Sequence, residues 1–80
     1  MWFYKYALMY YDDCEEKSRR ECGITVGENM KDAIDRLCQM YGDFWDLHID
    51  FCGEDSEDCL LPAGLNDFLQ WKVKYESDNA

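Results

Sequence analysis

Positive charge is scarce in this chain of 80 residues, and that scarcity excludes several classes of partner. Eight Lys and Arg stand against eighteen Asp and Glu, which gives a formal net charge of −10. Such a chain repels phosphate groups, so direct binding to nucleic acid or to an anionic membrane is disfavoured. It attracts basic surfaces instead, and proteins that grip nucleic acids present the commonest large ones.

Long apolar runs and targeting signals are also missing. No stretch of eighteen apolar residues occurs, and no charged segment is followed by an apolar segment and a cleavage site. We therefore expect a cytoplasmic protein. At this length the chain forms one small domain, residues 1–80, with a thin margin of stability.

No catalytic signature is present. The sequence has no G-x-S-x-G, no Walker loop, no H-E-x-x-H and no G-x-G-x-x-G. The single histidine, His48, would need a thiol within hydrogen-bond reach for Cys–His chemistry, and Cys52 on the same strand face lies more than ~10 Å away by strand rise. We predict a protein that is not an enzyme and binds no cofactor.

The five cysteines do not form a metal-binding pattern. None makes a C-x-x-C pair, and the spacing of a structural zinc site is absent. The acidic run at residues 54–58 lacks the alternation, the central Gly and the final Glu of an EF-hand loop, so no calcium site is expected. We expect free thiols, because a Cys14–Cys22 disulfide across a hairpin is disfavoured in a reducing compartment.

One helix is clearly indicated between Gly27 and Gly42. Its apolar residues recur with the spacing that places side chains along one side of a helix: Met30, Ala33, Ile34, Leu37, Cys38 and Tyr41. Charged residues fill the opposite side. Glu28 suits the positive end of the helix dipole, and Gly42 can adopt the left-handed conformation that ends a helix.

Strands are indicated on both sides of this helix. Residues 1–11 are rich in aromatic residues and apolar on both faces, which is typical of a central strand whose second face is covered or offered to a partner. Residues 22–26 predict a second strand that pairs antiparallel with the first, after a charged loop at 12–21. Residues 43–52 alternate, with Trp45, Leu47, Ile49 and Phe51 on one face and Asp46, His48 and Asp50 on the other.

The end of the chain carries two competing patterns. After an acidic loop at 53–58 and a connector at 60–64, residues 65, 68, 69 and 73 have helical spacing, whereas residues 69–75 alternate as in a strand. We favour a helical turn at 62–67 and a strand at 68–75, with a helix over 63–73 as the alternative. The expected fold is α+β: a mainly antiparallel sheet of three to four strands with one long helix on one face.

A binding surface is the remaining candidate for function. Alternate residues of a strand lie about 6.7 Å apart, so the face formed by Asp46, His48 and Asp50 can imitate a row of phosphates. Aromatic residues are common anchors of interfaces. The residues we expect at a partner are Glu15, Glu16, Asp46, Asp50, Glu54, Asp55, Glu57, Asp58 and Trp71.

The chain resembles the small acidic proteins of bacterial phages and prophages, among them the anti-CRISPR inhibitors. The resemblance spans roughly residues 2–52 and rests on the short length, the charge, the opening Phe3-Tyr4-Lys5-Tyr6 followed by Asp12-Asp13, and the helix that ends in Tyr41-Gly42. It implies a protein that binds a nuclease or another defence protein and blocks its nucleic-acid groove.

We therefore expect an inhibitor that binds a basic groove of a host defence protein, such as a CRISPR nuclease. The alternative is an assembly module that forms homodimers through the aromatic face of its sheet, which predicts self-association without affinity for basic proteins. A small metal or redox protein is a third possibility, which metal analysis and thiol counting would test.

Overall fold

A computed structural model describes residues 1–77 of the protein. Its elements are β1 (Trp2–Asp12), β2 (Lys17–Gly27), α1 (Met30–Tyr41), β3 (Phe44–Gly53), α2 (Ser56–Leu60) and α3 (Pro62–Ser77). The strands form one antiparallel sheet in the order β2-β1-β3. This confirms the α+β class, the antiparallel hairpin and the central position of the first strand.

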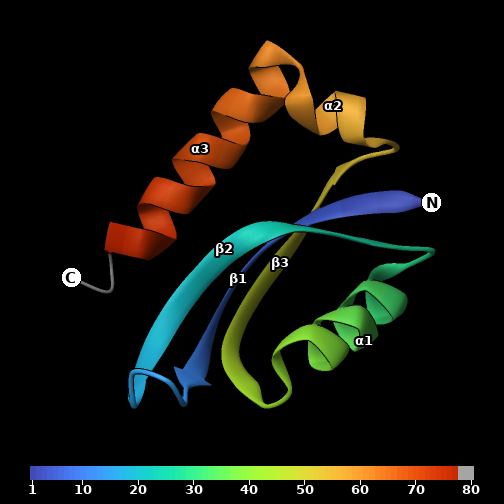
Figure 1. Ribbon diagram of the computed structural model, residues 1–80. Coiled ribbons are helices and arrows are strands. Elements are labelled where there is room, and N and C mark those ends of the chain that lie inside the picture. Colours follow the sequence, from blue (N-terminus) through green and yellow to red (C-terminus); the bar gives the residue numbers. More distant parts are fainter. Residues whose placement is uncertain (78–80) are drawn as a thin grey trace.

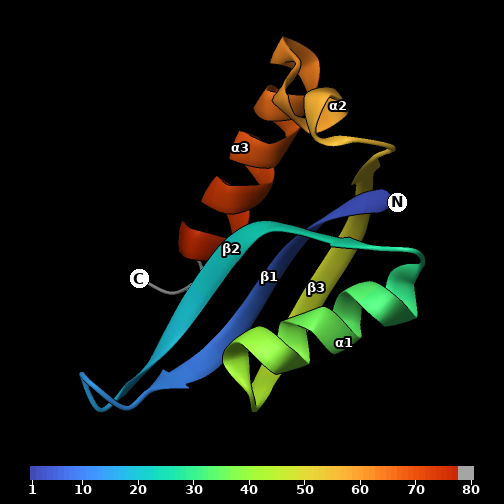
Figure 2. The ribbon, with the colours of Figure 1, turned by 45° about the vertical axis from the view of Figure 1, so that its right-hand side comes forward.

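Two helices cover the two faces of the sheet. α1 lies on one face and α3 on the other, as the two views in Figure 1 and Figure 2 show. Tyr6 and Leu8 of β1 belong to the cluster around Leu37 of α1. The ammonium of Lys5, which points to the opposite face, lies 5.1 Å from the centre of the Trp71 ring in α3. The second face of the sheet is thus covered by the chain itself.

The core forms where α1 meets β1. Leu8, Ala33 and Leu37 are each 0 % exposed, and burying a leucine side chain completely stabilises the fold by roughly 1.5–3 kcal/mol. α1 begins at its N-cap Asn29, whose side chain accepts a hydrogen bond from the backbone N–H of Asp32, and ends at Gly42 with φ +70°. The predicted helix is confirmed, together with the glycine that ends it.

A pair of tyrosines extends this core. The hydroxyl groups of Tyr6 and Tyr41 are 2.7 Å apart and share a hydrogen bond. Burial raises the pKa of Tyr6 above its ordinary value, and the hydrogen bond to Tyr41 raises it further. Gly23 lies opposite Tyr6 in the sheet, and a methyl group at Gly23 would come within 2.6 Å of the Tyr6 hydroxyl oxygen. A glycine is therefore required where the tyrosine ring crosses β2.

The charged segment 12–21 is mostly strand, so the predicted loop is wrong. β1 continues to Asp12, and β2 begins at Lys17 and not at residue 22. The ladder pairs Asp12 with Lys17, and Arg19 donates a hydrogen bond of 2.7 Å to Asp12. Charges of opposite sign on facing strands attract each other, so the dense charge supports a longer hairpin.

β3 has the predicted position, but an irregularity reverses the direction of Trp45. His48 pairs with Ala7 and Trp45 pairs with Met9, so β3 has one residue more than β1 in this stretch. Asp46 lies there with φ +53°. Because a bulge shifts the alternation by one residue, Trp45 faces the side of Met9, and Leu47 faces the core around Leu37. The prediction that both point the same way is wrong.

The last part of the chain is helical, which contradicts the preferred strand at 68–75. α3 runs from Pro62 to Ser77 as a helix of 16 residues, so the all-helical alternative was correct in type. The side chain of Trp71 packs on Tyr75, with ring centres 4.8 Å apart, and the ring of His48 stacks on Tyr75 at 4.5 Å. Of the polar face of β3, His48 thus contacts α3, whereas Asp46 and Asp50 stay exposed as predicted.

Both edge strands pass into a helix through the same local motif. Gly27-Glu28-Asn29 precedes α1, and Gly53-Glu54-Asp55 precedes α2. In each, the Asn or Asp caps the helix, and an Asp three residues later accepts a hydrogen bond from the Glu N–H. Such reciprocal bonds satisfy the free N–H groups of a helix start. They explain why the predicted loop at 53–58 contains helix α2.

The core predicts a large effect of shortening Leu37. Leu37→Ala removes buried contacts with Tyr6 and Leu8, and we expect the free energy of unfolding to fall by about 3 kcal/mol. Leu69→Ala is the matched control, because Leu69 is 48 % exposed and should lose less than about 1 kcal/mol. Urea unfolding followed by circular dichroism measures both, and equal losses would contradict this assignment of the core.

Candidate protein-binding surfaces

The carboxylates predicted to bind a partner lie in three separate places. Glu15 and Glu16 are in the turn between β1 and β2, whereas Asp46 and Asp50 belong to β3. Glu54, Asp55, Glu57 and Asp58 lie at the opposite end of the sheet, in α2 and just before it. Since β1 and β2 are antiparallel, the turn and α2 are at opposite ends, and the structure does not bring all eight carboxylates into one surface.

The carboxylates of the turn are partly neutralised. Glu15 forms ion pairs with Lys17 and Arg19, and these neighbours hold the pKa of Glu15 below its ordinary value. Asp12 pairs with Arg19, and its pKa is lowered although burial opposes the shift. Within residues 1–77, Glu16 forms no ion pair. Residues 12–16 hold four carboxylates, and Lys17 and Arg19 balance two of those charges, so this end of the molecule presents less net charge to a partner than the carboxylate count suggests.

Asp46 is also held within the molecule. Arg20 donates a hydrogen bond of 2.7 Å to Asp46, and the ring of His48 lies 3.2 Å from the other carboxylate oxygen. The Arg20 side chain is 10 % exposed, and its Nε and Nη1 atoms are buried without a hydrogen-bond partner. Asp46 is thus the partner of a buried guanidinium. The predicted row of phosphate-like groups along β3 is thus interrupted, because Asp46 is ion-paired and the His48 ring stacks on Tyr75 of α3.

Two further predicted residues make contacts within the chain, although Asp50 stays exposed. The carboxylate of Asp50 accepts a hydrogen bond from the Phe51 N–H at 2.9 Å. Trp71 is half-buried between α3 and the sheet, with the Lys5 ammonium over its ring, and its indole nitrogen is buried. Trp71 therefore supports the packing of α3 and is not an exposed anchor.

One cluster of carboxylates keeps its charge exposed. We call Glu54, Asp55, Glu57 and Asp58 the acidic corner. All four are exposed, and within residues 1–77 none of them forms an ion pair. Asp55 and Asp58 accept backbone hydrogen bonds at the start of α2, which fixes their positions without removing their charge. Leu60 and Leu61 follow directly and are 65 % and 55 % exposed.

An apolar stripe continues from this corner along the outside of α3. We call Leu61, Leu65, Leu69 and Val73 the leucine ridge; all four are exposed, and they recur at every fourth residue. The sequence alone does not identify this ridge, because residues 65, 69 and 73 also have the spacing of a helix face that packs against a sheet. Phe68, Trp71 and Tyr75, offset around the helix, are the residues that pack inward.

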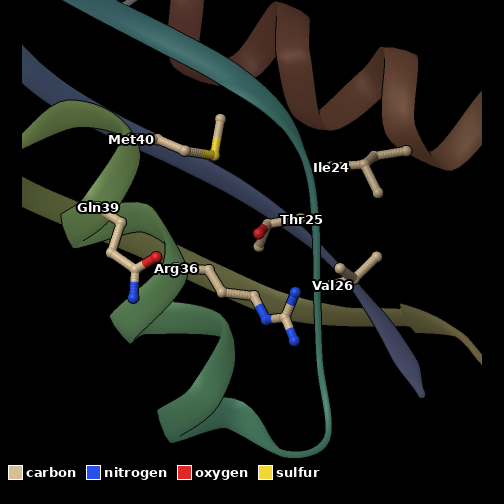
Figure 3. A pocket seen from close by; sticks show the side chains of 6 residues that line it. All are labelled: Ile24, Thr25, Val26, Arg36, Gln39 and Met40. Carbon is tan, nitrogen blue, oxygen red and sulfur yellow. The ribbon is translucent and has the colours of Figure 1, made fainter.

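A third surface is the groove between the edge of β2 and α1 (Figure 3). It has a volume of about 370 Å³ and is lined by Ile24, Thr25, Val26, Arg36, Gln39 and Met40. Arg36 is its only charged residue and is held by Asp32, 3.4 Å away. The rest of the lining is apolar apart from the Thr25 hydroxyl and the Gln39 amide.

The cysteines are free thiols in different surroundings. Cys14 and Cys38 are exposed, Cys52 is half-buried, and Cys22 and Cys59 are buried. Cys38 was expected on the apolar side of the helix, but the buried part of α1 is limited to Ala33 and Leu37. Burial raises the pKa of Cys59 to about 12, and a hydrogen bond with Cys52 contributes.

Among residues 1–77, no three His, Cys, Asp or Glu side chains are grouped so that they could hold a metal ion. No helix in the same range is both long enough and apolar enough to cross a membrane.

Comparisons with known proteins give no relative. No family model matches the chain, and neither a curated protein nor a solved structure matches it significantly. The similarity to anti-CRISPR inhibitors therefore rests on the residues quoted above.

The Asp46–Arg20 pair predicts a loss of stability in acid. Arg20 lowers the pKa of Asp46 below its ordinary value of 3.8, so folding favours the ionised form. This contribution is complete above about pH 4 and is lost as the pH falls through the lower native pKa. In Asp46→Asn it is absent at every pH.

We expect the free energy of unfolding to fall less between about pH 5 and pH 2.5 in Asp46→Asn than in the wild type. Urea unfolding at several pH values measures the difference. Relief of repulsion among the other carboxylates affects both proteins and cancels in the comparison. Identical pH profiles would show that Asp46 is not coupled to Arg20.

The cysteine environments predict an order of alkylation. Iodoacetamide should modify Cys14 and Cys38 first, because both are exposed. Cys59 should react last, because it is 1 % exposed and a thiol with a raised pKa forms little thiolate at neutral pH. Mass spectrometry of timed samples measures this order, and the urea-unfolded protein, in which all five thiols should react, is the control. Early modification of Cys59 would contradict its buried position.

Proposed function

We propose that the protein is a non-enzymatic binding protein that inhibits a nucleic-acid-binding protein by occupying its basic surface. The observation that carries the proposal is the acidic corner, where four carboxylates within residues 54–58 are exposed and unpaired by the chain's own Lys and Arg. Carboxylates in such a group compete with phosphates for Lys and Arg side chains.

The position of the corner suits this role. It is rigid, because Asp55 and Asp58 bond to the backbone at the start of α2, so little conformational entropy is lost on binding. Leu60 and Leu61 beside it offer apolar area that charge alone does not supply. Charge would determine the rate of encounter and the choice of partner, and the leucines would slow dissociation.

The target we would test first is a CRISPR nuclease, because of the resemblance described above. Such enzymes hold nucleic acid in a positively charged channel. The proposal places the protein in the cytoplasm of the cell that contains this nuclease. It assigns no role to the turn carboxylates, to Asp46 or to Trp71.

The test compares two double variants that remove the same charge. E54Q/E57Q neutralises the acidic corner without touching the capping residues, and E15Q/E16Q neutralises the turn at the other end of the sheet. Binding to a panel of purified, guide-loaded CRISPR nucleases is measured by biolayer interferometry at low and high salt. We expect E54Q/E57Q to weaken binding about tenfold, or roughly 1.4 kcal/mol, and E15Q/E16Q to change it little.

Target DNA should compete with the wild type, and the affinity should fall as salt increases. An affinity that does not depend on salt, or equal losses in the two double variants, would contradict a role for the acidic corner. Failure to bind any member of the panel would remove the CRISPR nuclease as the target.

A further inference from the structure

Two of the five cysteines lie against each other where β3 passes into α2. Cys52 is the last residue but one of β3, and Cys59 is the fourth residue of α2. Their thiols share a hydrogen bond. Cys59 is 1 % exposed, whereas Cys52 is half-buried. One thiol of the pair can therefore be reached from solvent, and the other is enclosed directly behind it.

An irregularity in β3 accounts for the direction of the Cys52 side chain. Gly53 pairs with Phe3 of β1. Phe51 pairs with the next residue of β1, Tyr4. Cys52 is thus an extra residue of β3 that has no partner in β1, which is the arrangement of a β-bulge. Bulges redirect a side chain and are common beside functional sites, and this one places the Cys52 thiol at α2.

Close packing on two sides holds α2 in place. A methyl group at Gly53 would come within 2.5 Å of the Asp58 Cβ atom, and a methyl group at Gly64 would collide with the Asp58 carbonyl oxygen. The Asp58 carboxylate also accepts a hydrogen bond of 3.1 Å from the Glu54 N–H. Because Cys59 follows Asp58 directly, these contacts fix its position relative to the end of β3.

We propose that Cys52 and Cys59 form a reversible redox site, which a low-molecular-weight disulfide such as oxidised glutathione converts into an intramolecular disulfide. Disulfides of reducing compartments are usually of this transient kind. The bond would close a loop of residues 52–59, which contains the whole acidic corner. The proposal goes beyond the proposed function and does not depend on it.

The oxidation takes place in two exchange steps. The Cys52 thiolate attacks one sulfur of oxidised glutathione, so that a mixed disulfide forms and one glutathione leaves as a thiolate. Cys59 then loses its proton, and its sulfur attacks the Cys52 sulfur and displaces the second glutathione. The two protein thiols lose two electrons and two protons in total, and one oxidised glutathione becomes two reduced ones. An excess of reduced glutathione reverses both steps.

The surroundings of the two thiols determine the order of these steps. Burial raises the pKa of Cys59 to about 12, and the hydrogen bond and the charge of a Cys52 thiolate contribute. Cys59 therefore does not attack first. In the mixed disulfide the Cys52 sulfur carries no charge, so that contribution is absent and Cys59 ionises more readily. The accessible thiol thus reacts with glutathione, and the enclosed thiol completes the bond.

Mass spectrometry of the purified chain in glutathione buffers tests the pairing. The thiols that remain are blocked with iodoacetamide, and the chain is cleaved before Asp residues, which separates Cys52 from Cys59. We expect the two peptides to stay joined until a reductant is added. C14S/C38S is the matched control, because it removes the two exposed thiols and should form the same joined peptides. Their absence, or joining of Cys22 in this control, would overturn the proposal.

Two single variants test the order of the steps. C59S should stop at a mixed disulfide between Cys52 and glutathione, because no neighbouring thiol displaces the glutathione. C52S should leave Cys59 unmodified, because Cys59 is enclosed. Circular dichroism establishes that both variants are folded. A glutathione adduct that forms on Cys59 of folded C52S as fast as on Cys52 of C59S would contradict the assigned roles.

A comparison with the unfolded chain separates the effect of the fold from that of short spacing. The folded chain holds the two thiols in contact, whereas a flexible loop brings them together only part of the time. The disulfide should therefore persist against a ratio of squared reduced to oxidised glutathione at least about tenfold higher in buffer than in concentrated urea. Equal ratios would show that the fold does not prepare this pair.

This outcome is separable from that of the proposed function, because the glutathione test contains no basic partner. E54Q/E57Q keeps both thiols, so it can lose the nuclease and still form the disulfide. C52S keeps all four carboxylates of the acidic corner and loses the disulfide, and under reducing conditions it should bind the nuclease as the wild type does.

Discussion

The contact of Tyr6 and Leu8 with Leu37 is the interaction on which the fold depends. It joins the central strand to α1, and it uses only one of the two apolar faces of β1. The other face would be exposed in a molecule that had one helix. α3 covers it through Trp71 and Tyr75, so a three-stranded sheet between two helices follows from one strand that is apolar on both sides.

Charge is arranged by the register of the strands. The hairpin places Arg19 beside Asp12, and the bulge in β3 brings Asp46 to Arg20. These pairs neutralise part of the charge at the end of the sheet where the turn lies. Within residues 1–77 the acidic corner forms no ion pair, so its negative potential is retained, and it is the better candidate for binding of the two acidic segments.

The passage from β3 into α2 at Gly53 places two surfaces next to each other. Gly53 and the capping residues around it repeat the passage at Gly27, but α2 ends after five residues, and Pro62 then begins α3 in a new direction. The acidic corner and the leucine ridge are therefore neighbours on one side of the molecule. An exposed apolar surface therefore adjoins the carboxylates that are proposed to meet a basic partner.

The sequence alone determined the central strand through its aromatic residues. It determined the helix that ends at Gly42 and the position of β3 through apolar periods that only one type of element satisfies. It also contained the signal for α2, since the motif at Gly27 recurs at Gly53. Residues 69–75 were undecided, because their apolar residues suit a strand as well as a helix. Tertiary structure decided them, since the open face of β1 needed a cover that a helix provides. It likewise decided which carboxylates form ion pairs. The pair between Asp46 and Arg20 joins residues that are far apart in the chain, and no local sequence pattern predicts such a contact.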